Sequence, residues 1–263
     1  MKKIYLAVIA AALLLPVLAS AQSPFDGTWR VNMNNVDWPK KPDVYLLQNG
    51  MYQCKTCVPL VDIKADGEDQ KVSGHPYIDT MSVKVINDHE IQETDKRNGK
   101  VVETSTITVS PDGSTMTVEF TDSSNTNGAP VTGRAEATRV AKGPAGSNAI
   151  SGSWRTTKVE NISSNAITWT YKVNGDELTM TNPTGQSYTA KLDGTEAPMK
   201  GDPGVTTVSV KKLGKNTIEE TDLRDGKVIS VVKMTVEPGG KTANLVAEDK
   251  LHGTTTRFTA TKQ

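Results

Sequence analysis

Residues 66–113 decide the fold, because the chain repeats them. They begin DGEDQKVSGHPYIDT (66–80), continue SVKVINDHEIQETDKRNGKVV (82–102) and end TVSPDG (108–113). At an offset of 127 residues the chain reads DGTEAPMKGDPGVTT (193–207), SVKKLGKNTIEETDLRDGKVI (209–229) and TVEPGG (235–240). A repeat of this length within one chain predicts two similar structural units.

The clearest strand pattern lies outward from the repeat, in the second unit. The segment ITWTYKV (167–173) alternates apolar and polar residues, which places Trp169 and Tyr171 on one face of a strand. Asn174-Gly175 follows and predicts a two-residue type I′ turn, since both positions of that turn need positive φ. Val44 and Leu46 lead into Asn49-Gly50 in the same way.

Gly-containing turn signals recur between short apolar-polar segments along the whole chain. They are found at Asp66-Gly67, Asn98-Gly99, Asp112-Gly113 and Asn127-Gly128. No long segment shows the 3.6-residue period of an amphipathic helix. Many short strands joined by hairpins predict an all-β protein of two tandem antiparallel up-and-down β-barrels, with about eight strands each.

The expected domain boundaries follow from the repeat and from the start of the chain. Residues 1–21 have the basic start, apolar middle and small-residue end of an export signal, with cleavage expected after Ala21. Residues 22–140 form the first predicted barrel and 150–263 the second. The stretch AKGPAGSNA (141–149) is the predicted linker. The signal predicts a periplasmic or secreted protein.

Composition excludes several classes of function. The chain has 30 basic and 30 acidic residues, a balance that argues against an electrostatic nucleic-acid binder. Outside the signal no apolar run reaches the length of a membrane span. No phosphate-binding Gly-rich loop, calcium loop or Ser-His-Asp order is present. We therefore expect no cofactor, no metal and no catalysis.

Cys54 and Cys57 are the only cysteines. In an exported protein the default expectation is a disulfide, here one that closes a tight loop. A redox pair, which would need a helix N-terminus at the first cysteine, and a metal site, which would need further ligands, are the alternatives. The three histidines (His75, His89 and His252) lie in turn-like sequence without the spacing of a metal site.

The repeated strand around Glu93 has charged residues on the face that alternation would turn inward. Ile91, Glu93, Asp95 and Arg97 share that face, and the second unit repeats the pattern around Glu220. One interpretation is a polar barrel interior in which Glu93 and Glu220 face a ligand or water. The other is an exposed strand with cross-strand ion pairs, each worth about 0.2–1 kcal/mol.

Tyr52, Trp169 and Tyr171 are the aromatic residues that would join Glu93 and Glu220 in facing a ligand. Their ordinary role would be as core or rim aromatics of the barrels. The ligand-facing set is thus expected only if the barrels are hollow.

Two features resemble the lipocalin and calycin-type barrels. Each unit opens with Gly-x-Trp, at Trp29 and at Trp154, followed by about eight hairpin-linked strands. The run through Gly99-Lys100-Val101 and Ser110-Pro111-Asp112-Gly113 is similar to an uncharacterised family of small exported bacterial proteins with lipocalin-like domains. The resemblance implies that each Trp closes a barrel floor beneath a basic residue, Arg139 over Trp29 and Arg257 over Trp154.

Two functions follow as expectations. The first is an exported, non-catalytic binding protein that carries a small apolar or amphipathic ligand inside a barrel. The second is a structural or interaction protein with filled barrels, whose protein partner the sequence does not identify. A cavity lined by apolar and aromatic side chains would favour the first.

Overall fold

A computed structural model describes residues 23–125 and 127–263. The predicted export signal, residues 1–21, lies outside the described residues. Within them the chain consists of antiparallel strands and a single 3₁₀ helix, η1 (Ser164–Ala166). No helix of the described part is long and apolar enough to cross a membrane. The all-β prediction is confirmed.

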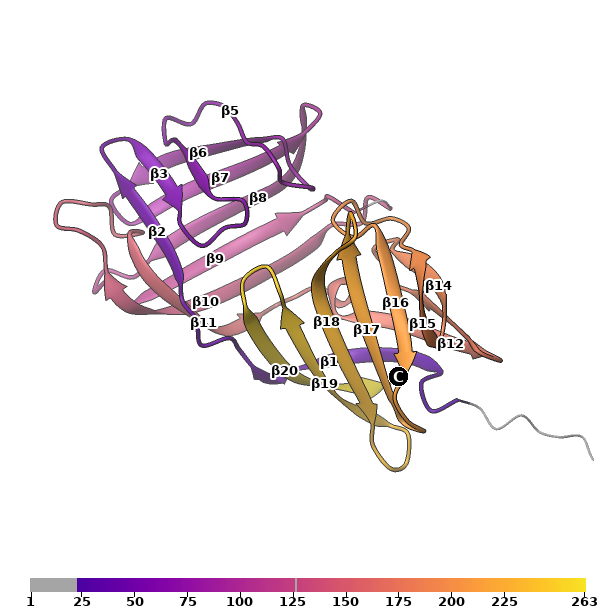
Figure 1. Cartoon of the computed structure of the whole chain (residues 1–263). Helices are drawn as coiled ribbons and strands as arrows, with labels where there is room; N and C mark the ends of the chain where they lie inside the picture. Colours follow the sequence, from indigo (N-terminus) through magenta and orange to yellow (C-terminus); the bar gives the residue numbers. More distant parts are fainter. Residues whose placement is uncertain (1–22, 126) are drawn as a thin grey trace, which may run out of the picture.

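The strands form two ten-stranded sheets, each curled into a nearly closed barrel (Figure 1). The first barrel contains, in spatial order, β4 (Val61–Lys64), β3 (Met51–Cys54), β2 (Asp43–Gln48), β11 (Gly152–Glu160), β10 (Val131–Lys142), β9 (Thr115–Asp122), β8 (Lys100–Val109), β7 (Glu90–Arg97), β6 (Thr80–Asn87) and β5 (Gln70–Lys71).

The second barrel contains, in the same spatial sense, β14 (Ser187–Lys191), β13 (Glu177–Thr181), β12 (Thr168–Asn174), β1 (Gly27–Asp37), β20 (Thr254–Lys262), β19 (Thr242–Asp249), β18 (Lys227–Val236), β17 (Thr217–Arg224), β16 (Thr207–Lys212) and β15 (Asp193–Pro198). Ten strands per sheet replace the predicted eight.

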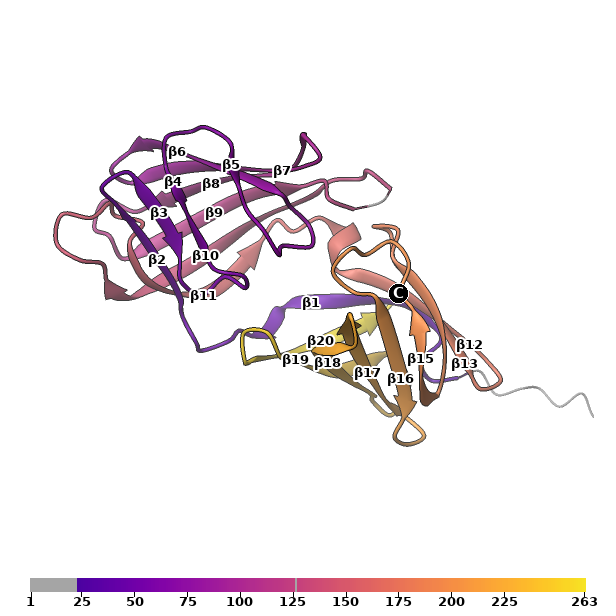
Figure 2. The ribbon, with the colours of Figure 1, turned by 45° about the horizontal axis from the view of Figure 1, so that its top comes forward.

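The two repeats exchange their first strands. β1 comes from the first repeat but lies between β12 and β20 of the second barrel. β11 comes from the second repeat but lies between β2 and β10 of the first barrel. The exchange is visible where indigo β1 lies beside yellow β20 (Figures 1 and 2). The expectation that each repeat closes around its own interior is therefore wrong.

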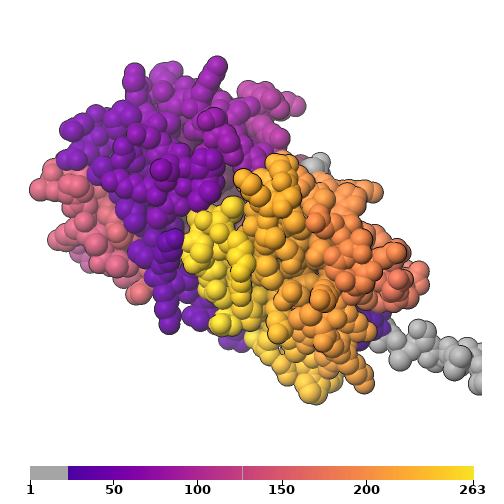
Figure 3. Space-filling model, in the orientation of Figure 1, coloured from indigo at the N-terminus to yellow at the C-terminus, as the bar shows by residue number. Residues whose placement is uncertain are grey.

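The chain crosses between the barrels at 38–42, after β1, and at 161–167, after β11. The predicted linker 141–149 does not cross, because β10 and β11 on either side of it are partners in one sheet. It separates the repeats of the sequence but not the sheets. At the first crossing Lys41 Nζ donates to the His252 carbonyl at 2.6 Å, and Figure 3 shows the two halves in contact there.

Each exchanged strand carries a tryptophan into the core of the other half's barrel. Trp29 is 0% exposed and Trp154 is 1% exposed. The Nε1 of each donates to the carbonyl of the residue four positions earlier, Phe25 or Ile150, at 2.8 Å. The buried positions of the two tryptophans are thus nearly equivalent, and a Gly-x-Trp strand from either repeat can occupy the same place in a barrel.

A basic side chain covers each tryptophan, but the predicted pairing is wrong. Arg139 Cζ lies 3.9 Å from the ring centroid of Trp154, not Trp29, because β11 is the strand beside β10. Lys262 Nζ lies 4.8 Å from the ring centroid of Trp29. Arg257 is exposed, since it is an odd number of residues from Lys262 and alternation turns it outward.

Alternation also places the two apolar cores. In β6, Met81 and Val83 are buried, whereas Val85 is 40% exposed near the end of the strand. In the second barrel the equivalent Val208 and Val210 are fully buried. Each barrel has its own apolar core, and each core includes the exchanged tryptophan.

The predicted hairpin turns form, with one difference. Asn49 and Gly50 have φ of 53° and 75°, as a type I′ turn requires. At the second hairpin β12 continues through Asn174, and the turn consists of Gly175 and Asp176 with only Gly175 at positive φ. The turn is shifted by one residue relative to the prediction.

The edges of the two barrels meet differently. In the second barrel Ser187 and Lys200 exchange two backbone hydrogen bonds, which join the edge strand β14 to the segment after β15. No such bridge between edge strands is found among the described residues of the first barrel. The disulfide Cys54–Cys57, with a Cα–Cα distance of 5.4 Å, joins the end of β3 to the loop before the edge strand β4, which confirms the predicted pairing.

Candidate functional site

The repeated charged strand faces the interior of each barrel. In β7, Ile91 is 0% exposed, and Glu93 follows two residues later on the same face. The Oε1 atom of Glu93 is buried without a hydrogen-bond partner, and Oε2 accepts from Ser105 Oγ at 3.5 Å. Of the two interpretations of this strand, the polar interior is the one observed.

Three carboxyl groups lie in register at the mouth of the first barrel, the end next to the Asn98-Gly99 turn. Asp95 on β7 is opposite Glu103 on β8, and Glu103 is opposite Asp122 on β9. We call these three residues the carboxyl row. Like charges directly opposite one another destabilise a sheet. The carboxyl row would therefore lower the stability of the first barrel if all three groups were ionised.

Burial raises the pKa of two members of this row, Asp95 and Glu103. Desolvation raises the pKa of Asp95 to about 8, and the neighbouring Glu93 and Glu103 raise it further. Desolvation, with Asp122 and Glu93 nearby, raises the pKa of Glu103 to about 7. Burial also raises the pKa of Glu93, opposed by hydrogen bonding from Tyr52 and Ser105. Near neutral pH the row therefore carries fewer than its full number of charges.

The equivalent carboxyl group of the second barrel is better satisfied. Glu220 Oε2 accepts from Tyr171 Oη at 3.1 Å and also from Tyr188 Oη. Burial raises the pKa of Glu220, and the neighbouring Asp222 raises it further. Asp222 keeps one buried oxygen without a partner. Opposite it, at the position of Glu103, lies the neutral Ser230.

A cleft of about 370 Å³ separates the mouths of the two barrels. Its lining comes from both halves: Tyr77, Ile78, Val102, Glu103, Asp122, Ser124, Asn125 and Val131 from the first barrel, and Ala166, Thr184, Gln186, Gly201 and Pro203 from the segments of the second. Two members of the carboxyl row, Glu103 and Asp122, thus open onto this inter-barrel cleft.

Equivalent loops of the two repeats touch at the cleft. Tyr77 Oη donates to Asp202 Oδ1 at 2.9 Å, and Gln186 Nε2 donates to Asp202 Oδ2 at 2.8 Å. Gly204, the repeat equivalent of Tyr77, leaves room for the phenol: a Cβ there would lie 2.1 Å from Tyr77 Oη. This contact holds the two mouths next to each other.

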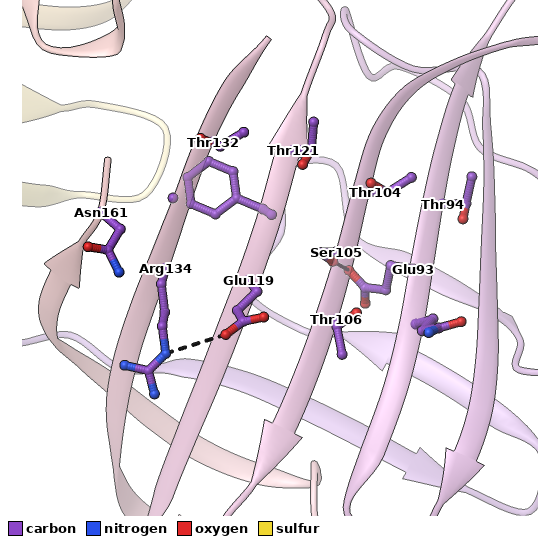
Figure 4. A pocket seen from close by; sticks show the side chains of 13 residues that line it. Glu93, Thr94, Thr104, Ser105, Thr106, Glu119, Thr121, Thr132, Arg134 and Asn161 are labelled. Carbon is purple, nitrogen blue, oxygen red and sulfur yellow. Dashed lines mark hydrogen bonds and ion pairs between the residues drawn. The ribbon is translucent and has the colours of Figure 1, made fainter. Parts of the chain in front are cut away.

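A larger groove, of about 580 Å³, lies along β7 to β10 of the first barrel. Figure 4 shows Glu93 beside Ser105 in it and Arg134 pointing to Glu119. Arg134 forms ion pairs with Glu160 at 2.9 Å, Glu136 at 3.4 Å and Glu119 at 3.6 Å. Because its basic group is already paired with three carboxylates, we consider the inter-barrel cleft the better candidate site.

The residues predicted to face a ligand do not form one site. Glu93 and Tyr52 lie in the first barrel, and Glu220, Trp169 and Tyr171 lie in the second. Tyr52 is 2% exposed and stacks on Tyr45, with ring centroids 6.3 Å apart. The rings of Trp169 and Tyr171 meet edge to face at 6.2 Å.

The sequence reasoning missed Glu103, and a β-bulge explains why. A regular hairpin through Asn98-Gly99 would place Val102 opposite Asp95. The register shifts by one between Asp95 and Lys96, so Glu103 takes that place instead. The second barrel has the same bulge after Asp222. Bulges often re-aim side chains next to functional sites.

Metal binding has no support in the described residues. They contain no group of three His, Cys, Asp or Glu side chains arranged to hold a metal ion. His252 Nδ1 contacts Asp249 Oδ2 at 2.5 Å, and His89 Nδ1 lies 3.2 Å from the Val109 carbonyl oxygen.

Comparison with known proteins does not indicate a family for this chain. The sequence matches none of the protein-family models, and a search of curated proteins returned no relative.

Proposed function

We propose that the protein is an exported, non-catalytic binding protein in which the first barrel takes a small amphipathic ligand through the inter-barrel cleft. The second barrel serves as a filled scaffold that forms the far wall of the cleft. The proposal thus assigns ligand binding to the first barrel and a structural role to the second. On this proposal the first barrel is lipocalin-like in use.

One observation carries the proposal. Glu93 and Glu220 are repeat equivalents, yet Glu220 is bound by two tyrosine hydroxyls while Glu93 leaves an oxygen buried without a partner. An unsatisfied buried acceptor typically costs about 1–3 kcal/mol, so a molecule that supplies a donor there gains affinity. The apolar residues Ile78, Val102 and Val131 offer the cleft a surface for a short hydrocarbon chain.

Export is the second element of the proposal. It rests on the signal-like sequence of residues 1–21 and on the Cys54–Cys57 disulfide, a bond that persists in oxidising compartments. Mass spectrometry of the protein recovered from its native host would identify the mature N-terminus. A chain that begins at Gln22 supports export, and an intact Met1 contradicts it.

The binding function is tested by thermal unfolding of the mature chain with octanoate, octanol and octylamine. We expect at least one of these to raise the melting temperature. Val131→Trp, which fills the cleft, should abolish the shift. Its matched control is Thr254→Trp, because Thr254 pairs with Asp249 in the second barrel as Val131 pairs with Asp122 in the first. No shift with any compound, or equal shifts in both variants, would contradict the proposal.

A further inference from the structure

The carboxyl row and the cleft together specify the chemistry of a ligand. Asp95, Glu103 and Asp122 lie side by side on three neighbouring strands, and two of them line the cleft. None of the ion pairs of the described residues involves the row. Lys96, the basic residue adjacent to Asp95 in sequence, is bound to Asp69 at 2.6 Å.

A second observation shows what the row lacks. Glu93 lies on the same face as Asp95 and two residues farther into the barrel, and its Oε1 atom is buried without any partner. Asp95 Oδ1 is buried without a partner as well. Two carboxyl oxygens at and beside the row, Glu93 Oε1 and Asp95 Oδ1, are therefore buried without a hydrogen-bond donor among the described residues.

A charged donor group fits these oxygens better than a neutral one. An ammonium group has three donors and no acceptor, so it can bind several carboxyl oxygens at once. Charge-assisted hydrogen bonds are about twice as strong as neutral ones. An ammonium group can take the place of the protons that Asp95 and Glu103 hold near neutral pH, which an anionic carboxylate or phosphate cannot do.

We propose that the ligand of the first barrel is a primary amine with a short apolar chain, whose ammonium group binds the carboxyl row and whose chain lies along Ile78, Val102 and Val131. This assignment rests on the proposed binding function and narrows it to one chemical class. It also explains the asymmetry of the repeat, since Ser230 stands where the first barrel has Glu103.

The test compares three head groups on one eight-carbon chain by isothermal titration of the mature chain. We expect octylamine to bind at least tenfold tighter than octanol and octanoate not to bind. Glu103→Gln should weaken octylamine about tenfold and leave octanol unchanged. Glu220→Gln, the matched change at an interior acid of the second barrel, should change octylamine binding less than twofold. Asp122→Asn replaces Glu103→Gln if the latter does not unfold cooperatively.

The outcomes separate the two proposals. If octanol or octanoate binds as tightly as octylamine, the binding function stands and the amine assignment is wrong. If octylamine binds the Glu103→Gln and Asp122→Asn variants as tightly as it binds the parent protein, the carboxyl row is not the binding site of the ammonium group. If calcium chloride stabilises the protein and displaces octylamine, the row is a metal site and the assignment is also wrong. If no compound binds, both proposals are wrong.

Discussion

The two barrels are built from the same repeat, yet they differ at two places. In the second barrel a bridge between Ser187 and Lys200 joins β14 to the segment after β15, while the first barrel has instead the disulfide loop Cys54–Cys57 beside its edge strand β4. Inside, Glu220 accepts hydrogen bonds from two tyrosine hydroxyls, while Glu93 keeps its Oε1 atom buried without a partner. The comparison teaches that one duplicated sheet can hold the equivalent interior glutamate with two tyrosine partners or with one oxygen unpartnered.

The tyrosines that make this difference are not all repeat equivalents. Tyr171 lies opposite Met180 as Tyr45 lies opposite Cys54, so these two tyrosines share a position. Tyr188 lies on β14, and the equivalent position on β4 is Val61. The first barrel therefore has no hydroxyl at the position from which Tyr188 binds the interior carboxyl group.

The largest effect should come from removing the exchanged tryptophans. Truncating a buried Trp to Ala costs about 3–5 kcal/mol. Because the first strands are exchanged, Trp154→Ala should weaken the first barrel, residues 43–142, and Trp29→Ala the second. Hydrogen exchange followed by mass spectrometry locates the loss. Faster exchange in the barrel of the residue's own repeat would contradict the exchange.

The next effect concerns Asp95, whose folded-state pKa of about 8 lies well above its ordinary value of 3.8. The folded protein therefore holds a proton that the unfolded chain releases. The stability that this group contributes is fully present below about pH 4 and is lost as the pH rises towards 8. Asp95→Asn keeps a neutral side chain at every pH.

We accordingly expect Asp95→Asn to match the parent at pH 4 and to be more stable by about 1–3 kcal/mol at pH 9. Urea unfolding at the two pH values measures this. Ser230→Ala, at the neutral position of the second barrel, is the control and should show no such pH dependence. A variant that loses stability at pH 9 would contradict a buried, protonated Asp95.

A smaller effect should distinguish the interior tyrosines. Tyr188→Phe removes a donor to Glu220 and should cost about 1–2 kcal/mol, the usual range for a buried hydrogen bond to an acidic group. Tyr52→Phe should cost less than about 1 kcal/mol, because Glu93 Oε1 is already without a partner. Denaturant unfolding gives both values. Equal costs would mean that the two carboxyl groups are equally satisfied.

Much of the fold was predictable from the sequence. The repeat gave two similar units, and Asn49-Gly50 and Asn98-Gly99 gave hairpins whose φ values are positive as expected. The strand exchange was not predictable, because Trp29 and Trp154 occupy nearly identical buried positions. The local sequence around each tryptophan therefore does not indicate which barrel its strand joins. The same ambiguity caused the wrong pairing of Arg139 with Trp29.

Less of the candidate site was predictable. Alternation placed Glu93 and Glu220 inside, since both follow a buried Ile by two residues. The carboxyl row depends on a bulge after Asp95, and a bulge shifts register without a clear local signal. The contact of Tyr77 with Asp202 depends on how the barrels lie together, which no single strand encodes.

Cysteine cross-linking tests the strand exchange most directly. Arg30 lies opposite Thr168. In an unexchanged barrel Arg30 would occupy the position of Arg155, which lies opposite Thr138. In monomeric protein with Cys54 and Cys57 replaced by Ser, we predict that Arg30→Cys/Thr168→Cys forms a disulfide and that Arg30→Cys/Thr138→Cys does not. A disulfide in the second variant and none in the first would contradict the exchange.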